Sequence, residues 1–346
     1  MRLVDNVVGV ILLLSINLLV FNNACLFKRR FLYSPSTPWH DHWLTIGLLI
    51  WAQIVLAEVI LGTLGLLRYA CLAATMAAMN VMLRIVNRRS GESGAGEKRL
   101  VLVPERIFDF GVELVLIAIG LSVLVILTLI NLITPPANWD SLNYHLTFPA
   151  RWYKDERLSL VITPFADMAT TYYPINAELV FLWFLLPSGS VVVSDIAQSP
   201  FVLGGFVAAY GIGKILGFDT RAALWAGILS LFIPMVMING ALWSYNDVVM
   251  GVSFVIAVYF ALCFVREATK IRAILCGISL GLFIGTKGLS ILFAAPLIVY
   301  IAMCICKNRK RGFATKAVAM LLPIVLFGGY TYIRNWIVAK KPCLSF

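Results

Sequence analysis

Three acidic residues near the ends of long apolar runs are the first candidates for chemistry. Asp140 follows the apolar run 111–134, Glu178 lies about one turn into the next run, and Asp247 begins the run 247–265. A carboxylate at such a depth is costly unless it is paired or faces a wet cavity. A carboxylate can also deprotonate a reacting hydroxyl group as a general base. We therefore expect Asp140 and Asp247 to be catalytic, with Asp140 as the base.

Polar side chains from separate segments accompany these acids and are expected to bind substrate. Cations next to a membrane can hold a lipid phosphate, and oxygen ligands can hold a divalent ion that does the same. Glu178 and Asp140 are the expected ligands of such an ion, which would be Mg²⁺, Mn²⁺ or Zn²⁺. The expected substrate-binding and phosphate-binding residues are Tyr144, His145, Tyr173, Asn246, Lys287, Arg334 and Asn335.

Each of these residues also has a structural interpretation. Asp140 and Asp247 could cap helix ends, since acidic side chains favour those positions. Glu178 could pair with a nearby tyrosine or asparagine, and His145 could form hydrogen bonds at the membrane interface. The two cations could extend toward lipid headgroups along their apolar stems. The residue types alone leave these alternatives open.

The elements that must position these residues are membrane helices. The chain has 346 residues, of which 61% are hydrophobic and 13% charged. Soluble domains are typically about 45–50% apolar and about 25% charged, so lipid must cover much of this surface. We predict an all-α, polytopic transmembrane helix bundle. Its expected spans are 7–27, 44–64, 69–86, 111–134, 174–188, 190–216, 222–243, 247–265, 271–286, 288–305 and 317–338.

The placement of the basic residues gives the bundle a direction. The net charge is +11, but most Lys and Arg lie in short clusters between apolar runs. That pattern follows the positive-inside rule, and no basic domain with interleaved aromatics is present to bind nucleic acid. The clusters place 28–43 and 84–106 inside. The long segment 135–173 then lies on the outer face, where 146–160 is expected to form an interfacial helix with Trp152 and Tyr153 at headgroup level.

One stretch conflicts with this topology. Passing from outside at Tyr173 to inside at Lys214 requires an odd number of crossings, yet two apolar runs lie between them. A break of the run 190–216 at Pro200 and Gly204-Gly205 would restore the parity. A run that only dips into the membrane would restore it equally well.

The order of the polar motifs resembles the GT-C superfamily of membrane glycosyltransferases, which use polyprenyl-phosphate sugars. The similarity rests on Trp139-Asp140 with Tyr144-His145, on Tyr173-Pro174, and on the run from Gly211 to Asp247. It also rests on Gly285-Thr286-Lys287 and on Arg334-Asn335-Trp336 followed by Lys341-Pro342. Relatives include protein O-mannosyltransferases and lipid A aminoarabinose transferases, and a poorly characterised bacterial branch looks closest. The acidic pair of the protein mannosyltransferases is absent, because Ser141 follows Asp140.

The resemblance implies a fold and an activity. It implies a GT-C-like core over 111–346, which contains the outer loop 135–173 with its expected short interfacial helices. The N-terminal helices and the basic cytoplasmic loop over 1–110 lie outside this core. It implies inverting transfer of a sugar from a polyprenyl phosphate to a glycan, lipid or protein acceptor, at the outer face of the cell inner membrane. Family members continue for several more spans, so the chain is expected to be a fragment, the product of a split gene or a minimal variant.

Two other classes of function remain open. A transporter or flippase for lipid-linked or anionic substrates would use the same cations for binding. Transporters, however, often contain inverted repeats and binding sites near the midplane, whereas these polar residues cluster at one face. A non-catalytic membrane assembly subunit is the third interpretation.

Overall fold

The computed structural model describes residues 2–32, 37–89, 111–162, 168–307 and 313–340, and all regular structure in these ranges is helical. Seven helical segments there are long and apolar enough to cross a membrane, and nine if each of two bent pairs counts as one span. This is the architecture of a multi-pass membrane protein. Most of the predicted basic loop 84–106, and the Lys341-Pro342 motif, lie outside the described residues.

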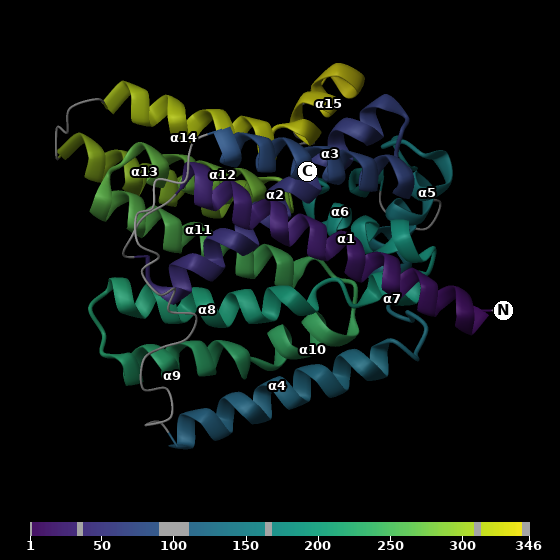
Figure 1. Cartoon of the computed structure of the whole chain (residues 1–346), viewed down its shortest axis with the longest axis horizontal. Helices are drawn as coiled ribbons and strands as arrows, with labels where there is room; N and C mark the ends of the chain where they lie inside the picture. The colour runs from purple at the N-terminus through teal and green to yellow at the C-terminus, as the bar shows by residue number, and fades with distance from the viewer. Residues whose placement is uncertain (1, 33–36, 90–110, 163–167, 308–312, 341–346) are drawn as a thin grey trace.

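The long helices run side by side along the longest axis of the molecule (Figure 1). They match the predicted spans closely, because a helix must remain apolar over about 20 residues to cross the hydrocarbon layer. The helices of this group are α1 (Arg2–Phe31), α2 (Trp39–Leu64), α3 (Tyr69–Arg89), α4 (Gly111–Asn131), α8 (Ser199–Ile215), α11 (Asp247–Glu267), α12 (Lys270–Ile284) and α13 (Ser290–Lys307).

Two predicted single spans are bent pairs of helices. The run 222–243 divides into α9 (Thr220–Leu231) and α10 (Pro234–Leu242), which meet at 55°. Pro234 begins α10, and proline cannot donate the backbone hydrogen bond that would continue the preceding helix. The run 317–338 divides into α14 (Phe313–Gly328) and α15 (Tyr330–Ala339), which meet at 60°.

The run 190–216 is interrupted, but not at the predicted glycines. A short helix α7 (Val191–Asp195) precedes α8, and the break falls at 196–198. Gly204 and Gly205 lie inside the continuous helix α8, so the predicted break at these residues is wrong, whereas Pro200 lies in the first turn of α8, directly after the observed break. Gly205 instead packs closely against α11, where an added Cβ would lie 3.2 Å from the Val252 side chain. Close helix contact explains the small residue here without a hinge.

The helices differ strongly in how much of their surface is covered. In the most apolar 18-residue stretch of each helix, 67% of the residues are buried in α2 but only 17% in α4. Helix α4 lies at the edge of the bundle, beside α9 and α10 (Figure 1). The short helix α6 (Asn176–Ser188) is enclosed by α1, α2, α5 and α7. The N-terminal helices α1 and α2 thus pack directly against the later ones, and the domain boundary near residue 110 stays a prediction.

Helices α12 and α14 approach each other backbone to backbone. A Cβ added at Gly277 would lie 2.2 Å from the Met320 carbonyl oxygen, and one at Gly328 would lie 2.7 Å from the Gly281 carbonyl oxygen. Only glycine permits such contact, a common solution in membrane bundles, where tight packing replaces the hydrophobic effect. This contact fixes the start of α15 relative to α12.

The predicted outer segment contains three short helices at one end of the bundle. They are the π-helix η2 (Ser141–His145), the α-helix α5 (Thr147–Asp155) and the 3₁₀-helix η3 (Met168–Tyr172). The expected helix within 146–160 is present as α5, but Trp152 is only 1% exposed and its indole N–H donates to the Ser159 carbonyl at 2.8 Å. Trp152 is therefore a core residue and not a headgroup anchor. We call this end of the bundle the Asp140 end.

Candidate functional site

A buried histidine–carboxylate pair lies at the centre of the Asp140 end. His145 closes η2, and its Nδ1 lies 2.8 Å from Oε1 of Glu178, the third residue of α6. Both side chains are almost completely buried. The second oxygen of Glu178, Oε2, is buried and has no hydrogen-bond partner. Hydrogen bonding therefore offsets the cost of burying the Glu178 carboxylate at one oxygen only.

Asn246 links this pair to two further elements. Its amide Nδ2 lies 3.4 Å from Glu178 Oε1 and 3.4 Å from the Thr286 carbonyl oxygen, in the loop after α12. Its own Oδ1 is buried without a partner. Asn246 directly precedes α11 but makes no side-chain capping bond there. Four segments therefore meet around one buried carboxylate.

An ion pair lies beside this buried group. Lys287 Nζ is 2.6 Å from Asp247 Oδ1, and the two side chains are 28% and 48% exposed. Asp247 occupies the first turn of α11, where the helix dipole favours a negative charge. The ammonium group has three donors and one of them serves Asp247, so it can hold another anion as well.

Asp140 differs from the other two acids because it has no partner. It is half-buried, directly precedes η2, makes no capping bond, and has no hydrogen bond or ion pair with the described residues. Its neighbours are the half-buried phenols of Tyr144 and Tyr245. Burial raises the pKa of Tyr144, and Asp140, Glu178, Tyr173 and Asp247 raise it further. Burial, then Asp140 and Asp247, likewise raise the pKa of Tyr245. Both phenols therefore remain hydrogen-bond donors at neutral pH.

The aromatic rings form a continuous wall around these groups. The Tyr144 ring centroid lies 4.0 Å from that of His145 and 6.3 Å from that of Tyr173. The Tyr245 ring lies 6.3 Å from the His145 ring on another side. Tyr173 thus borders the site through its ring.

Arg334 and Asn335 lie at the margin of the site. The Asn335 amide donates to the Tyr172 carbonyl at 2.8 Å, and the Arg334 guanidinium donates to the Thr171 carbonyl at 3.2 Å. Both residues of α15 therefore fasten η3, which leads directly to Tyr173. In this arrangement they contact the backbone, and their predicted role in binding phosphate stays a prediction.

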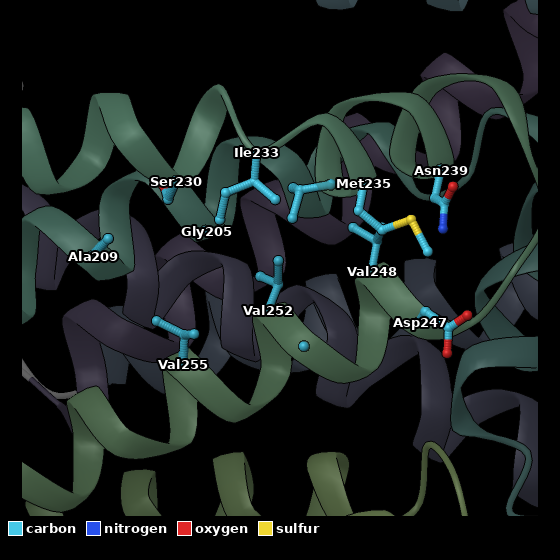
Figure 2. A pocket seen from close by; sticks show the side chains of 12 residues that line it. Gly205, Ala209, Ser230, Ile233, Met235, Asn239, Asp247, Val248, Val252 and Val255 are labelled. Carbon is cyan, nitrogen blue, oxygen red and sulfur yellow. The ribbon is translucent and has the colours of Figure 1, made fainter.

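An apolar cavity of about 270 Å³ opens between α8, α11 and the bent pair α9–α10. Figure 2 shows Val252 and Val255 along its length, and Asn239 and Asp247 together at one end. Asn239 is fully buried, and neither polar atom of its amide has a hydrogen-bond partner. A buried amide without partners costs free energy, so a polar group of a ligand at this end of the cavity would gain hydrogen bonds with Asn239.

Sequence reasoning missed three features of this region. Tyr245 was not among the predicted site residues, although it directly precedes Asn246 and Asp247. Asp195 is buried in an apolar run and accepts a hydrogen bond from Ser244, and an acidic residue in such a run is itself a signal. Asn239 carries no local signal, since its importance comes from the lack of partners in the folded chain.

The predicted divalent ion would depend on carboxylate oxygens of Glu178 and Asp140, and it stays a prediction. No group of three or more His, Cys, Asp or Glu side chains in these ranges is close enough to hold a metal ion. Glu178 uses Oε1 for His145, which leaves a single orphan carboxylate oxygen there. The roles of Glu178 and Asp140 as metal ligands stay predictions.

Comparison of the chain with protein-family models, with curated proteins and with solved structures gives no match. The resemblance to GT-C glycosyltransferases therefore rests on the sequence motifs alone.

Proposed function

We propose that this protein is a membrane glycosyltransferase that moves a sugar from a polyprenyl phosphate to an acceptor hydroxyl. The site would lie on the outer face of the cell membrane, as the distribution of basic clusters predicts. The order of the sequence motifs is the basis for proposing sugar transfer. The geometry of the Asp140 end supports a lipid-linked substrate.

The observation that carries the proposal is an apolar cavity lined at its polar end by Asp247, the acid that pairs with the Lys287 ammonium group. Along α11 the cavity extends from Asp247 to Val255, which is about 12 Å at the rise of an α-helix. Asp247, at its polar end, pairs with Lys287 at 2.6 Å. An amphiphile with an apolar chain and an anionic head fits this combination, whereas a small polar metabolite would leave the apolar surface without a partner.

The unpaired carboxylate of Asp140 suits it to accept a proton. In the proposed reaction the acceptor oxygen attacks the anomeric carbon while the bond from that carbon to the phosphate oxygen breaks. The hydroxyl proton passes to Asp140, and the polyprenyl phosphate leaves as an anion beside Lys287. A single displacement inverts the anomeric centre. Preorganised donors such as Lys287, Tyr144 and Tyr245 would stabilise the charge on the leaving group.

Substitution of Asp140 tests the proposal. Proteoliposomes would receive undecaprenyl-phosphate-linked hexoses with a membrane-lipid extract as acceptor, and release of undecaprenyl phosphate would be measured. Asp140→Asn is expected to lower the rate by about 10²–10⁴-fold, the usual contribution of a general base. Asp155→Asn is the matched control, because Asp155 lies in the same segment and forms a 2.9 Å surface ion pair with Arg151. Unchanged release by Asp140→Asn would overturn the assignment.

A lipid flippase is the second candidate, and the bent helices favour it. Broken membrane helices that border a binding site are typical of transporters, and the α9–α10 bend borders the cavity. The same proteoliposomes separate the two functions. A flippase would move a fluorescent polyprenyl-phosphate sugar between leaflets without releasing the phosphate, and a transferase would release it.

A further inference from the structure

The candidate base Asp140 is attached to an unusual helix. Residues Ser141–His145 form a π-helix, closed by a 2.9 Å bond from the Leu146 amide to the Ser141 carbonyl oxygen. Single π-turns are rare, because the ordinary α-turn is more favourable. Those that do occur are frequently found at functional sites. Asp140 contributes no capping bond to this turn. The Thr147 hydroxyl donates to the Leu142 carbonyl within the turn, and contacts from elsewhere in the fold support it further.

The last residue of the π-helix makes the strongest of these contacts. The His145 ring is buried, and its Nδ1 lies 2.8 Å from Glu178 Oε1. An ionised carboxylate can only accept a hydrogen bond, so pairing with an ionised Glu178 requires the proton on Nδ1 and leaves Nε2 unprotonated in the neutral ring. The ring is further enclosed by Tyr144, at 4.0 Å between centroids, and by Phe181, at 6.3 Å.

Glu178 in turn belongs to the most firmly anchored helix start in the site. Asn176 begins α6, and its side-chain amide donates to the Leu282 carbonyl at 3.1 Å and to the Phe327 carbonyl at 2.8 Å. The Asn176 backbone amide donates to the Gly285 carbonyl at 2.8 Å. The carboxylate is therefore fixed relative to both α12 and α14.

We propose that His145 and Glu178 are positioning residues, which hold the π-turn so that Asp140 and Tyr144 face the substrate. They do so as an imidazole–carboxylate pair, in which Glu178 fixes the tautomer and the orientation of the ring. Loss of the pair lets the turn relax toward the α form, which rotates Asp140 and Tyr144 relative to α6. The catalytic consequence rests on the proposed transferase function, whereas the contact and its effect on the turn do not.

Histidine NMR tests the contact without any activity. The sequence contains three histidines, so the His40→Asn/His42→Asn variant leaves His145 as the single imidazole. In ¹⁵N-histidine-labelled protein, we expect a ring protonated at Nδ1, and we expect Glu178→Gln to shift its signal. Glu58→Gln is the matched control, since Glu58 is fully buried in α2 with both oxygens unpartnered. An unchanged signal in Glu178→Gln, or a ring protonated at Nε2 alone, would overturn the proposal.

If the double variant does not fold, the difference spectrum between the wild type and His145→Asn isolates the same signal. The same two outcomes then apply to that spectrum.

Kinetics tests the consequence for catalysis. We expect Glu178→Gln and His145→Asn to lower kcat by at least about tenfold, the size of a modest loss of preorganisation. The pH profile of the remaining activity should match that of the wild type, because Asp140 is still the base. Glu58→Gln and His40→Asn should retain the wild-type kcat. A changed pH profile would overturn a pure positioning role, and so would full activity in both variants. A wild type without transfer activity would overturn the proposed function, while the NMR result would still decide whether Glu178 holds the His145 ring.

Discussion

Acidic side chains lie at both ends of α11 and α12, but their hydrogen bonds are complete at one end and incomplete at the other. At the end away from Asp140, Asp41 Oδ1 accepts hydrogen bonds from the Tyr259 hydroxyl at 2.9 Å and from Arg272 at 2.8 Å. Arg272 also donates to Glu267 at 2.8 Å. This Asp41 network joins α2, α11 and α12. At the Asp140 end, Asp140 has no partner among the described residues, and Glu178 keeps one buried oxygen unpaired there.

The difference separates structural polarity from functional polarity. A buried charge whose hydrogen bonds are complete fixes helices to one another and offers nothing to a ligand. A carboxylate that lacks partners costs free energy in the fold, and where it lies at the candidate site, as Asp140 does, it is available for chemistry. Residue type alone would have ranked Asp41 and Asp140 equally. Their hydrogen bonds distinguish them.

The largest expected effect concerns stability at the Asp41 network. Asp41→Ala should destabilise the protein by about 3–5 kcal/mol, because it removes the buried partner of the Arg272 guanidinium and leaves only the exposed Glu267 carboxylate. Asp140→Ala should change stability by less than about 0.5 kcal/mol, as expected for a residue without such contacts. Thermal unfolding in detergent micelles measures both. Equal losses in the two variants would remove the distinction between the ends.

A smaller effect is expected for the cation at the Asp140 end. Lys287→Met should weaken binding of undecaprenyl phosphate by about 10–100-fold, the worth of a charged hydrogen bond of about 1.5–3 kcal/mol. Its effect on stability should stay below about 1 kcal/mol, because the pair with Asp247 is partly exposed. Tritiated undecaprenyl phosphate binding measures the first and thermal unfolding the second. Lys154→Met, in the nearby helix α5, serves as the control.

A glycine at the border of the site gives the next effect. A Cβ at Gly285 would lie 2.1 Å from the Asn176 amide nitrogen. Gly285→Ala should therefore break the two bonds of that amide to the Leu282 and Phe327 carbonyls and lower stability by about 1–3 kcal/mol. Gly288→Ala, where nothing lies within 4 Å of an added Cβ, is the control. Similar unfolding temperatures for both variants would contradict the assigned contact.

The smallest effect is a titration. Burial and the nearby carboxylates raise the pKa of Tyr144 in the folded state. The folded protein therefore holds this proton more tightly than the unfolded chain, and the resulting stabilisation is present below the ordinary tyrosine pKa of about 10 and lost as the pH rises above it. The tyrosinate absorbance of the wild type minus that of Tyr144→Phe should show ionisation only above that value. Ionisation at or below it would contradict the described surroundings.

The sequence predicts the spans better than their bends. The predicted run 69–86 corresponds to Tyr69–Arg89 and the run 247–265 to Asp247–Glu267, because the length of an apolar run is a direct physical requirement of the bilayer. Pro234 could have predicted the bend between α9 and α10. The run 222–243 was nevertheless predicted as one span, because its hydropathy stays high on both sides of the proline. The burial of α2 could not be predicted, because lipid and protein interiors accept the same apolar residues.

The candidate site was predictable by residue type and only partly by contact. Sidedness alone indicated that Asp247 and Lys287 belong to one surface, and the structure places them 2.6 Å apart. The pairing of His145 with Glu178 was not predictable, because nothing local couples two residues separated by α5 and η3. The absence of partners for Asp140 is likewise a property of the whole fold.

The contacts of α15 also bear on the order in which the molecule can be assembled during synthesis. The Asn335 amide holds the Tyr172 carbonyl, across 163 positions of the chain. Helices generally insert and fold from the N-terminus as they are made, and contacts of high sequence separation form late. Tyr173 therefore reaches its final place only after the ribosome has made the last described helix. Until then, the polar groups around Asp140 lie in an incomplete bundle. A chaperone that shields this end would therefore act before α15 is synthesised.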